Sequence, residues 1–441
     1  MSRTRLSPTG CLLRISCLSL GLMLQVAVTP ASQAGALEEY VQRPDPSFAW
    51  KAVEQKQQAG FTITRLDVTS QTWHDLRWTH TMQIGHPAKV RNPGVALLVI
   101  AGSGDGSSSF NLMKTVSEQA GILVAVVANV PNQPLFNGRN EDALIAYTFD
   151  QYLKTGDETW PLLLPMVKSA VRAMDAVQAY AQAEYGQKVE KFVVTGVSKR
   201  GWTTWLSAAA DPRVAAIAPA VIDMLNMKAQ TEWTQKVYGR QSEKIRAYTD
   251  LKLVEKMDTP QMVALRGLVD PYSYRRNYRL PKLILLGTND PFWTVEALKH
   301  YWYDLPGPKL VYQAPNTGHA QTAESIQTMA AVFQMVADGK ELPTVEWQFS
   351  GADHRNVTVT ASQQAKAARL WTAESATHDF RKATWSSQAL PVTRDGREAA
   401  AAVQLPASGY RAYMVELTLT ASTGADYKVS TQVQVVPENV Q

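Results

Sequence analysis

The sequence is almost free of cysteine. Its 441 residues contain two, Cys11 and Cys17, and both lie close to the N-terminus. The chain beyond residue 17 therefore has no disulfide, no cysteine nucleophile and no thiolate metal ligand. Histidines are also few, seven in all, and none falls in an HxxxH or H-E-x-x-H grouping. We therefore expect neither a metal site nor a cofactor.

An excess of charge is also lacking. The formal net charge is +5, and three of the arginines, Arg3, Arg5 and Arg14, lie in the first 34 residues, which contain no acidic residue. Without that segment the remaining 407 residues carry a net charge of +2. Because no long run of Lys or Arg occurs, the sequence argues against nucleic-acid binding. With 45% hydrophobic and 19% charged residues, the composition is that of an ordinary globular protein.

Residues 1–34 are typical of a signal peptide for export. The arginine-bearing start is followed by an apolar run, Ile15–Val28, and by small residues where cleavage after Ala34 or Ala36 fits. The alternative is an uncleaved membrane anchor, but this run of 14 residues is shorter than the roughly 20 that span a bilayer. We expect a periplasmic or secreted protein with no integral membrane segment after signal removal.

Short, continuous apolar runs recur along the chain and predict buried strands. They lie at Val95–Gly102, Ile122–Val130, Lys191–Gly196, Lys282–Gly287 and Lys309–Pro315, and two earlier strands are expected around Phe61–Leu66 and Trp78–Ile84. Helices are expected through Met113–Ala120 and Pro165–Tyr185. This alternation predicts an α/β protein whose mainly parallel sheet carries helices on both faces, as in α/β-hydrolases.

Two parts of the chain interrupt the alternation. Residues 226–280 are rich in helix formers and aromatic residues, and we interpret them as a helical cap over one edge of the sheet. Beyond Leu342 the segments become short and alternating, with Gly, Asp and Ser between them, which predicts a C-terminal antiparallel β-sandwich. The predicted domains are an α/β-hydrolase-like domain over 35–342 and a sandwich over 343–441.

The segment FVVTGVSKRGW, Phe192–Trp202, carries the clearest chemical signal. An apolar strand runs into Gly-x-Ser-x-x-Gly and then into a predicted helix, which is the setting of the nucleophile in α/β-hydrolases. The second glycine comes one position later than in G-x-S-x-G. Ser198 is thus a candidate nucleophile, although a serine between glycines is by itself more often a helix cap.

Two polar residues follow later strands in the order that this fold requires. Asp290 comes three residues after the glycine that ends LILLG, and His319 lies in the loop after the next strand. The interval between them leaves room for one helix and one strand. Ser198, His319 and Asp290 therefore form a candidate catalytic triad of nucleophile, base and acid. Asp223 and Asp270, in or beside the predicted cap, are competing candidates for the acid.

Backbone N–H groups near Ser198 are candidates for the oxyanion hole. One belongs to Lys199, the residue after the nucleophile, and the other to the loop Gly102-Ser103-Gly104-Asp105. The loop lacks the G-x-x-x-x-G-K-[ST] pattern of a nucleotide-binding loop. The side chains of Lys199 and Arg200 leave two interpretations open, contact with an anionic substrate or oxyanion, or a salt bridge to a buried acid such as Asp175 or Asp223.

Several long motifs give the chain a family resemblance. GVSKRGWTTWLSAAADPRV, VIDMLNM, VDPYSYR, PKLILLGTNDPFW and PNTGH occur in order, together with RNEDALIAYT and WPLLLPMVKSAVRAMD. The chain resembles the PhoPQ-activated pathogenicity-related protein family over most of residues 38–350. The resemblance implies an exported α/β-hydrolase-like protein, tied in bacteria to envelope stress and virulence, with Ser198, Asp290 and His319 at the family's triad-like positions. The turn around Ser198 is also similar to that of glucuronoyl esterases.

Two functions of different classes remain open. The first is a serine hydrolase that cleaves a small-molecule or peptide ester or amide through an acyl-enzyme, with esterase and peptidase activity not distinguished. The second is a secreted binding or signalling protein that keeps the scaffold without turnover. The complete triad favours the enzyme. The residues do not fix the oligomeric state.

The predicted signal peptide can be tested directly. Protein recovered from the periplasm or the medium should begin near Gly35 or Leu37, because the small residues before these positions suit the cleaving peptidase. N-terminal sequencing checks this result. A membrane-bound product that begins at Met1 or Ser2 would contradict it.

Overall fold

The computed structural model describes residues 1–2 and 34–438 of the chain. The predicted signal peptide, apart from its last residue and the first two, lies outside the described residues. Residues 34–438 belong to one compact unit. Within the described residues, no helix combines the length and apolar character that a membrane span needs.

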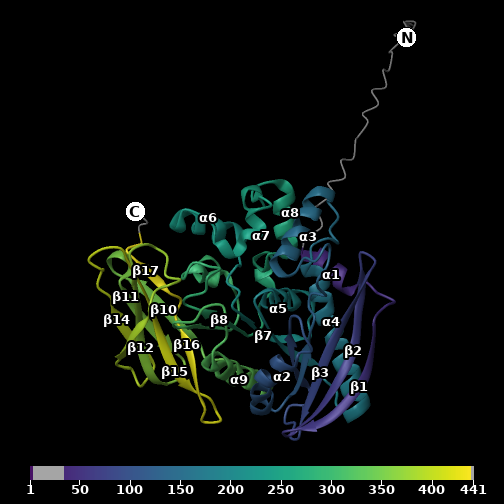
Figure 1. The fold of residues 1–441 in the computed structure, drawn as a ribbon. Helices are drawn as coiled ribbons and strands as arrows, with labels where there is room; N and C mark the ends of the chain where they lie inside the picture. Colours follow the sequence, from purple (N-terminus) through teal and green to yellow (C-terminus); the bar gives the residue numbers. More distant parts are fainter. Residues whose placement is uncertain (3–33, 439–441) are drawn as a thin grey trace. The chain divides into compact units, whose positions relative to one another are not determined.

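A nine-stranded sheet is the centre of the fold (Figure 1), with the strand order β1-β2-β3-β5-β4-β6-β7-β8-β9. The strands from β4 to β9 pair in parallel, whereas β1, β2 and β3 are antiparallel additions at one edge. The bounds are β1 Ala49–Gln58, β2 Phe61–Trp73, β3 Leu76–Pro87, β4 Val95–Ile100, β5 Leu123–Val127, β6 Lys191–Val197, β7 Val214–Ala220, β8 Lys282–Gly287 and β9 Lys309–Ala314.

Helices cover both faces of this sheet because the strands are apolar on both sides. Leu98 of β4 belongs to the same hydrophobic cluster as the helices α4 and α5, whereas its neighbours Leu97 and Val99 belong to the cluster that contains α2 and α9. The α/β architecture with helices on both faces is therefore as predicted. The helices are α1 Ala34–Gln42, α2 Ser107–Ala120, α3 Glu141–Thr155, α4 Leu163–Tyr185, α5 Lys199–Ala210 and α9 Ala323–Ala337.

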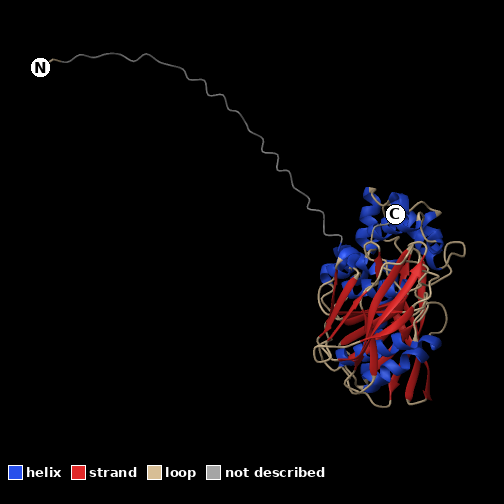
Figure 2. Ribbon diagram, turned by 90° about the vertical axis from the view of Figure 1, so that its left-hand side faces the viewer, coloured by secondary structure: helices blue, strands red, loops and turns tan. Residues whose placement is uncertain are grey.

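The predicted cap is a group of short helices between β7 and β8 (Figure 2). Its parts are α6 Met227–Tyr238, η1 Glu243–Ile245, α7 Arg246–Thr249, η2 Val254–Lys256, α8 Pro260–Val269 and η3 Pro271–Asn277. Thr259 caps α8 by accepting a hydrogen bond from the Met262 N–H, and proline follows it at the first helical position.

Antiparallel sheets follow α9, as predicted for the C-terminal region. One has the order β10-β11-β14 and the other β13-β12-β15-β16, with β17 also paired to β15. The bounds are β10 Val345–Ser350, η6 Ala352–His354, β11 Asn356–Ala361, β12 Ala365–Ser375, β13 Ser386–Leu390, β14 Glu398–Ala402, β15 Tyr410–Thr420, β16 Asp426–Ser430 and β17 Gln434–Val436. Tyr427 and Val429 of β16 share a hydrophobic cluster with α9, and we keep the division at 342/343 as a proposal.

The helices α1 and α3 were not among the predicted elements, and two further elements differ from the prediction. The edge strand β1 was not expected, because its residues are nearly all exposed and show no apolar alternation. The helix expected between Asp290 and His319 is replaced by two short 3-10 turns, η4 Ala297–His300 and η5 Trp302–Asp304. Prolines at 291, 306 and 308 flank these two turns, and the missing N–H of Pro306 and Pro308 prevents a helix from continuing toward β9.

Candidate active site

Ser198 occupies a strained turn between β6 and α5. Its backbone has φ 58° and ψ −123°, a conformation that non-glycine residues rarely adopt. The Ser198 N–H donates to the Ala220 carbonyl, and the Ser198 carbonyl accepts the first hydrogen bond of α5 from Trp202. The neighbouring strand and the helix thus hold the turn in place, and strain of this kind is a feature of nucleophile turns in α/β-hydrolases.

The spacing of the two glycines follows from close approaches on either side of the turn. A Cβ on Gly196 would lie 2.5 Å from the Arg200 carbonyl oxygen, and one on Gly201 would lie 2.7 Å from the Ile222 side chain. The second glycine is therefore needed at position 201, where α5 passes β7.

His319 joins Ser198 to Asp290. Its Nε2 lies 2.8 Å from the Ser198 Oγ, and its Nδ1 lies 2.8 Å from the Asp290 Oδ2. The other oxygen of Asp290 accepts the Phe292 N–H at 2.9 Å, and the Phe292 ring lies 4.4 Å from the imidazole ring, between centroids. The structure thus brings the three predicted residues together where β6, β8 and β9 end.

The two competing acids have other partners. Asp223 accepts a hydrogen bond from the Tyr301 hydroxyl at 2.7 Å, and Asp270 accepts the backbone N–H groups of Asn226, Met227 and Tyr272. Burial raises the pKa of Asp223 to about 7, and the charges of nearby Asp290 and Glu296 act in the same direction. Asp290 is the acid that contacts His319.

Lys199 and Arg200 pair with acids that the sequence analysis did not name. Arg200 makes a bidentate contact with Glu141, with both Nη–Oε distances 2.7 Å, and its Nε donates to the Val130 carbonyl at 2.6 Å. Lys199 Nζ lies 2.7 Å from Asp142 Oδ2. Asp175, one of the expected partners, pairs instead with Arg172 and Arg213.

Of the two interpretations of Arg200, the structure favours the salt bridge. The guanidinium is buried and occupied by protein acceptors, so it is not directed at a substrate. Glu141 starts α3 with a left-handed backbone, and its side chain also accepts from Gln133. Sequence patterns gave no sign of this pair because its members are 59 residues apart.

The glycine-rich loop 102–105 lies beside the start of α5. A Cβ on Gly102 would lie 2.9 Å from the Arg200 guanidinium, so the loop and Arg200 are in contact. The Gly104 N–H donates to Asn129 Oδ1 at 3.2 Å, and Ser103 Oγ accepts from Gln133 at 3.1 Å. Gly104 therefore has an internal acceptor for its N–H, whereas Gly102 and Ser103 stay candidate oxyanion donors from this loop.

A cavity of about 90 Å³ adjoins Ser198 beneath the cap. Phe292 lies between His319 and this cavity, and most of the other lining side chains are aliphatic or aromatic. Among the described residues, no three His, Cys, Asp or Glu side chains gather as a possible metal site.

Comparisons with known proteins assign the chain to a family. Residues 37–381 match the family described as PhoPQ-activated pathogenicity-related protein. The chain belongs to this family. It is also 30% identical to the autocrine proliferation repressor protein A of Dictyostelium discoideum, in an alignment that covers 96% of this chain and 93% of the relative.

Solved structures with a similar fold include two acetyl xylan esterases. The enzyme from Thermoanaerobacterium sp. JW/SL YS485 is 15% identical with a TM-score of 0.52, and the alignment covers 69% of this chain and 92% of that one. The enzyme from Paenibacillus sp. R4 is 15% identical with a TM-score of 0.50 over 68% and 91%. At this identity the likeness shows that this member of the PhoPQ-activated pathogenicity-related protein family has an α/β-hydrolase fold.

The Glu141–Arg200 pair predicts a pH-dependent contribution to stability. Burial alone would raise the pKa of Glu141, but the hydrogen bonds and charge of Arg200 lower it to about 2, below the ordinary 4.5. The carboxylate therefore stabilises the fold above pH 4.5 and this contribution is lost as the pH falls toward 2.

We expect Glu141→Gln to cost about 1–2 kcal/mol at pH 7, because Glu141 is partly exposed and the pair is partly screened. The cost should shrink at pH 3.5. Urea unfolding of both proteins at each pH measures it, with the exposed Glu118→Gln on α2 as a control. A cost that is the same at pH 7 and pH 3.5 would contradict the assignment.

Proposed function

We propose that this protein is a serine hydrolase that cleaves an ester or amide through an acyl-enzyme on Ser198. The observation that carries the proposal is the chain of two 2.8 Å contacts from Ser198 through His319 to Asp290, beside a cavity. Both distances are within the range in which a base can take the proton of a nucleophile and an acid can orient that base.

The reaction proceeds in two halves. Ser198 Oγ bonds to the substrate carbonyl carbon while its proton passes to His319 Nε2, and Asp290 stabilises the imidazolium. The tetrahedral intermediate expels the alcohol or amine, which takes the proton from His319. Water then attacks the acyl carbon while His319 takes its proton. The bond from that carbon to Ser198 Oγ breaks, the serine regains the proton from His319, and the acid is released. The N–H group of Lys199, with that of Gly102 or Ser103, is assigned to the oxyanion.

We also propose that the protein is exported, with residues 1–34 as its signal, and is periplasmic or secreted. A link to envelope stress or virulence rests on family membership. The alternative function is a binding or signalling protein that does not turn over substrate. It is favoured by the name of the Dictyostelium relative, which describes repression of proliferation and no reaction.

The triad is tested by Ser198→Ala and His319→Ala. Each should lower kcat toward p-nitrophenyl esters by about 10³–10⁶, because nucleophile and base act as one unit. Unfolding midpoints should change little, and fluorophosphonate labelling should disappear in Ser198→Ala. The exposed Ser408→Ala serves as the matched control. Wild-type turnover by Ser198→Ala would exclude the mechanism, and a wild-type protein that neither labels nor turns over would favour the alternative function.

A further inference from the structure

The cavity beside Ser198 has an almost entirely apolar lining. Its walls come from the cap, from α5 and from the loop that carries Asp290, and they include Trp202, Met224, Tyr248, Leu253, Met257 and Phe292. Such a surface gains free energy when apolar groups replace water in it. Methionines in the lining let the wall adapt to the shape of a bound chain.

Most polar groups of the lining are already occupied within the protein, and the indole N–H of Trp293 is the exception. Asp142 accepts from the Tyr248 hydroxyl at 3.1 Å and pairs with Lys199 at 2.7 Å. The amide of Gln230 donates to the carbonyls of Leu225 and Ala297, and Thr231 donates to backbone carbonyls of its own helix. A charged or strongly polar ligand would lose its water here with only this one unpartnered donor to replace it.

We propose that this cavity binds the acyl group of the substrate and selects a short apolar chain. The proposal rests on the proposed hydrolase function in taking Ser198 as the reacting group. The volume of about 90 Å³ sets the length, because an apolar cavity of about 150 Å³ holds benzene. By proportion, the cavity accommodates an acyl chain of about four carbons.

Kinetics with p-nitrophenyl acetate, butyrate, hexanoate and decanoate test the selection. Each methylene that enters the cavity should raise kcat/KM about fourfold, so butyrate should exceed acetate about 15-fold. The gain should stop once the chain outgrows the cavity. If acetate is the best substrate, or if decanoate continues the rise, the proposal is wrong although the hydrolase function stands.

A variant in the cap tests the location. Val254 lines the cavity, whereas Val263 is 47% exposed on α8 of the same cap. Val254→Phe should fill part of the cavity and lower kcat/KM for butyrate and hexanoate about tenfold, with acetate much less affected. Val263→Phe, the same change on the outer surface, should behave as wild type. Equal losses on acetate and hexanoate would contradict the location.

Binding without turnover separates this proposal from the catalytic one. Ser198→Ala protein should bind ethyl hexanoate more tightly than ethyl acetate. The change in tryptophan fluorescence on titration measures this binding, because Trp202 and Trp293 both line the cavity. Val254→Phe in that background should abolish the difference. If Ser198→Ala binds the longer ester more tightly but the wild-type protein hydrolyses neither ester, the hydrolase function is excluded and the apolar site stands. Binding that ignores chain length would exclude the apolar site.

A different set of contacts supports a second inference. The loop between β12 and β13 lies against both loops that carry the acid and the base. Asn289, next to Asp290, donates to the Ala383 carbonyl at 2.7 Å. Asn316, three residues before His319, exchanges two hydrogen bonds with the backbone of Trp385, at 2.9 and 2.7 Å.

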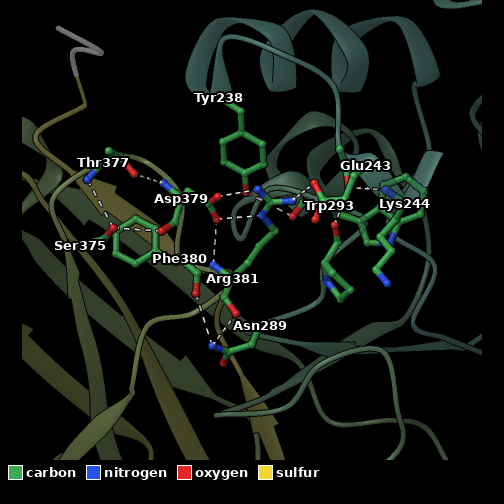
Figure 3. A network of polar contacts seen from close by, with 12 residues as sticks. Tyr238, Glu243, Lys244, Asn289, Trp293, Ser375, Thr377, Asp379, Phe380 and Arg381 are labelled. Carbon is green, nitrogen blue, oxygen red and sulfur yellow. Dashed lines mark hydrogen bonds and ion pairs between the residues drawn. The ribbon is translucent and has the colours of Figure 1, made fainter. Parts of the chain in front are cut away.

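The same loop also contacts the cap. Arg381 pairs with Asp379 beside it and reaches Glu243 of η1 at 3.1 Å, and its guanidinium lies 4.7 Å from the centre of the Tyr238 ring (Figure 3). The Tyr238 hydroxyl in turn donates to the Trp293 carbonyl. Residues 379–385, here called the bridging loop, therefore connect the acid loop, the base loop and the cap.

We infer that the bridging loop positions Asp290 and His319 relative to each other, with Asn289 and Asn316 as the positioning residues. Like the first inference, its kinetic test rests on the proposed hydrolase function. Neither asparagine contacts the triad's reacting atoms, and both act by fixing the backbone of the loop that each belongs to. Misplacement of a catalytic group by about 1 Å can cost a hundredfold in rate.

Asn289→Ala and Asn316→Gly test this inference. Glycine is chosen at 316 because the backbone there is left-handed, with φ 55°. Each variant should lower kcat about 10- to 100-fold with KM within about twofold. Asn137→Gly is the control, since Asn137 is exposed with φ 65° and lies outside these contacts. A fall in stability with unchanged kcat, or a rise in KM alone, would overturn the inference.

A spectroscopic measurement needs no turnover. The proton between His319 Nδ1 and Asp290 should give a downfield NMR signal in the wild-type protein, because the two atoms lie 2.8 Å apart. The signal should be absent in Asp290→Asn and should broaden or shift in Asn289→Ala and Asn316→Gly. An unchanged signal in both asparagine variants would contradict a positioning role, whatever the hydrolase assay shows.

Discussion

The buried guanidinium of Arg200 is the constraint that organises the edge of the sheet around Ser198. A charge taken out of water must be paired and hydrogen-bonded. Here the partners are the carboxylate of Glu141 at the start of α3 and the carbonyl of Val130. Because Arg200 belongs to the first turn of α5, these contacts fix the helix whose N-terminus presents Ser198. The same contacts hold the guanidinium against Gly102, so the glycine-rich loop lies beside the turn of Ser198.

The second consequence of this arrangement is electrostatic. Two adjacent cations at the N-terminus of a helix oppose the helix dipole. Glu141 and Asp142 neutralise these two cations, and the hydroxyl of Tyr248 in the cap donates a hydrogen bond to Asp142. The region around Ser198 therefore carries two cations that are each paired with a carboxylate of α3. Because Lys199 and Arg200 are paired in this way, the basic sequence Lys199-Arg200 can adjoin a mainly apolar cavity.

The sequence predicted what depends on local pattern. Strands buried on both faces are continuous apolar runs, and the order of Ser198, Asp290 and His319 after three such runs was enough to predict that they meet. The edge strand β1 was not predicted, because an exposed strand has no continuous apolar run. The partner of Arg200 was not predicted, because Glu141 lies 59 residues away and has a left-handed backbone that no local pattern indicated.

The bridging loop shows the same limit over a longer range. Asn289 and Asn316 are 94 and 69 residues from their partners Ala383 and Trp385, and an asparagine in a loop is usually a turn residue. Only the folded chain shows that the side chain amides face another backbone. What sequence patterns missed is therefore the set of contacts that holds the predicted residues in place, and not the residues themselves.

The proposed acid, Asp290, and one wall of the cavity belong to the same short segment. Asp290 contacts His319, while Phe292 and Trp293 line the cavity, and Phe292 also packs on the imidazole ring. The cap holds this segment from the other side, because Ser242 donates to the Pro291 carbonyl at 2.7 Å. A displacement of the cap is therefore transmitted to the acid. Substrate fit beneath the cap and alignment of the proposed triad are not independent, since Phe292 both lines the cavity and packs on His319, two residues from Asp290.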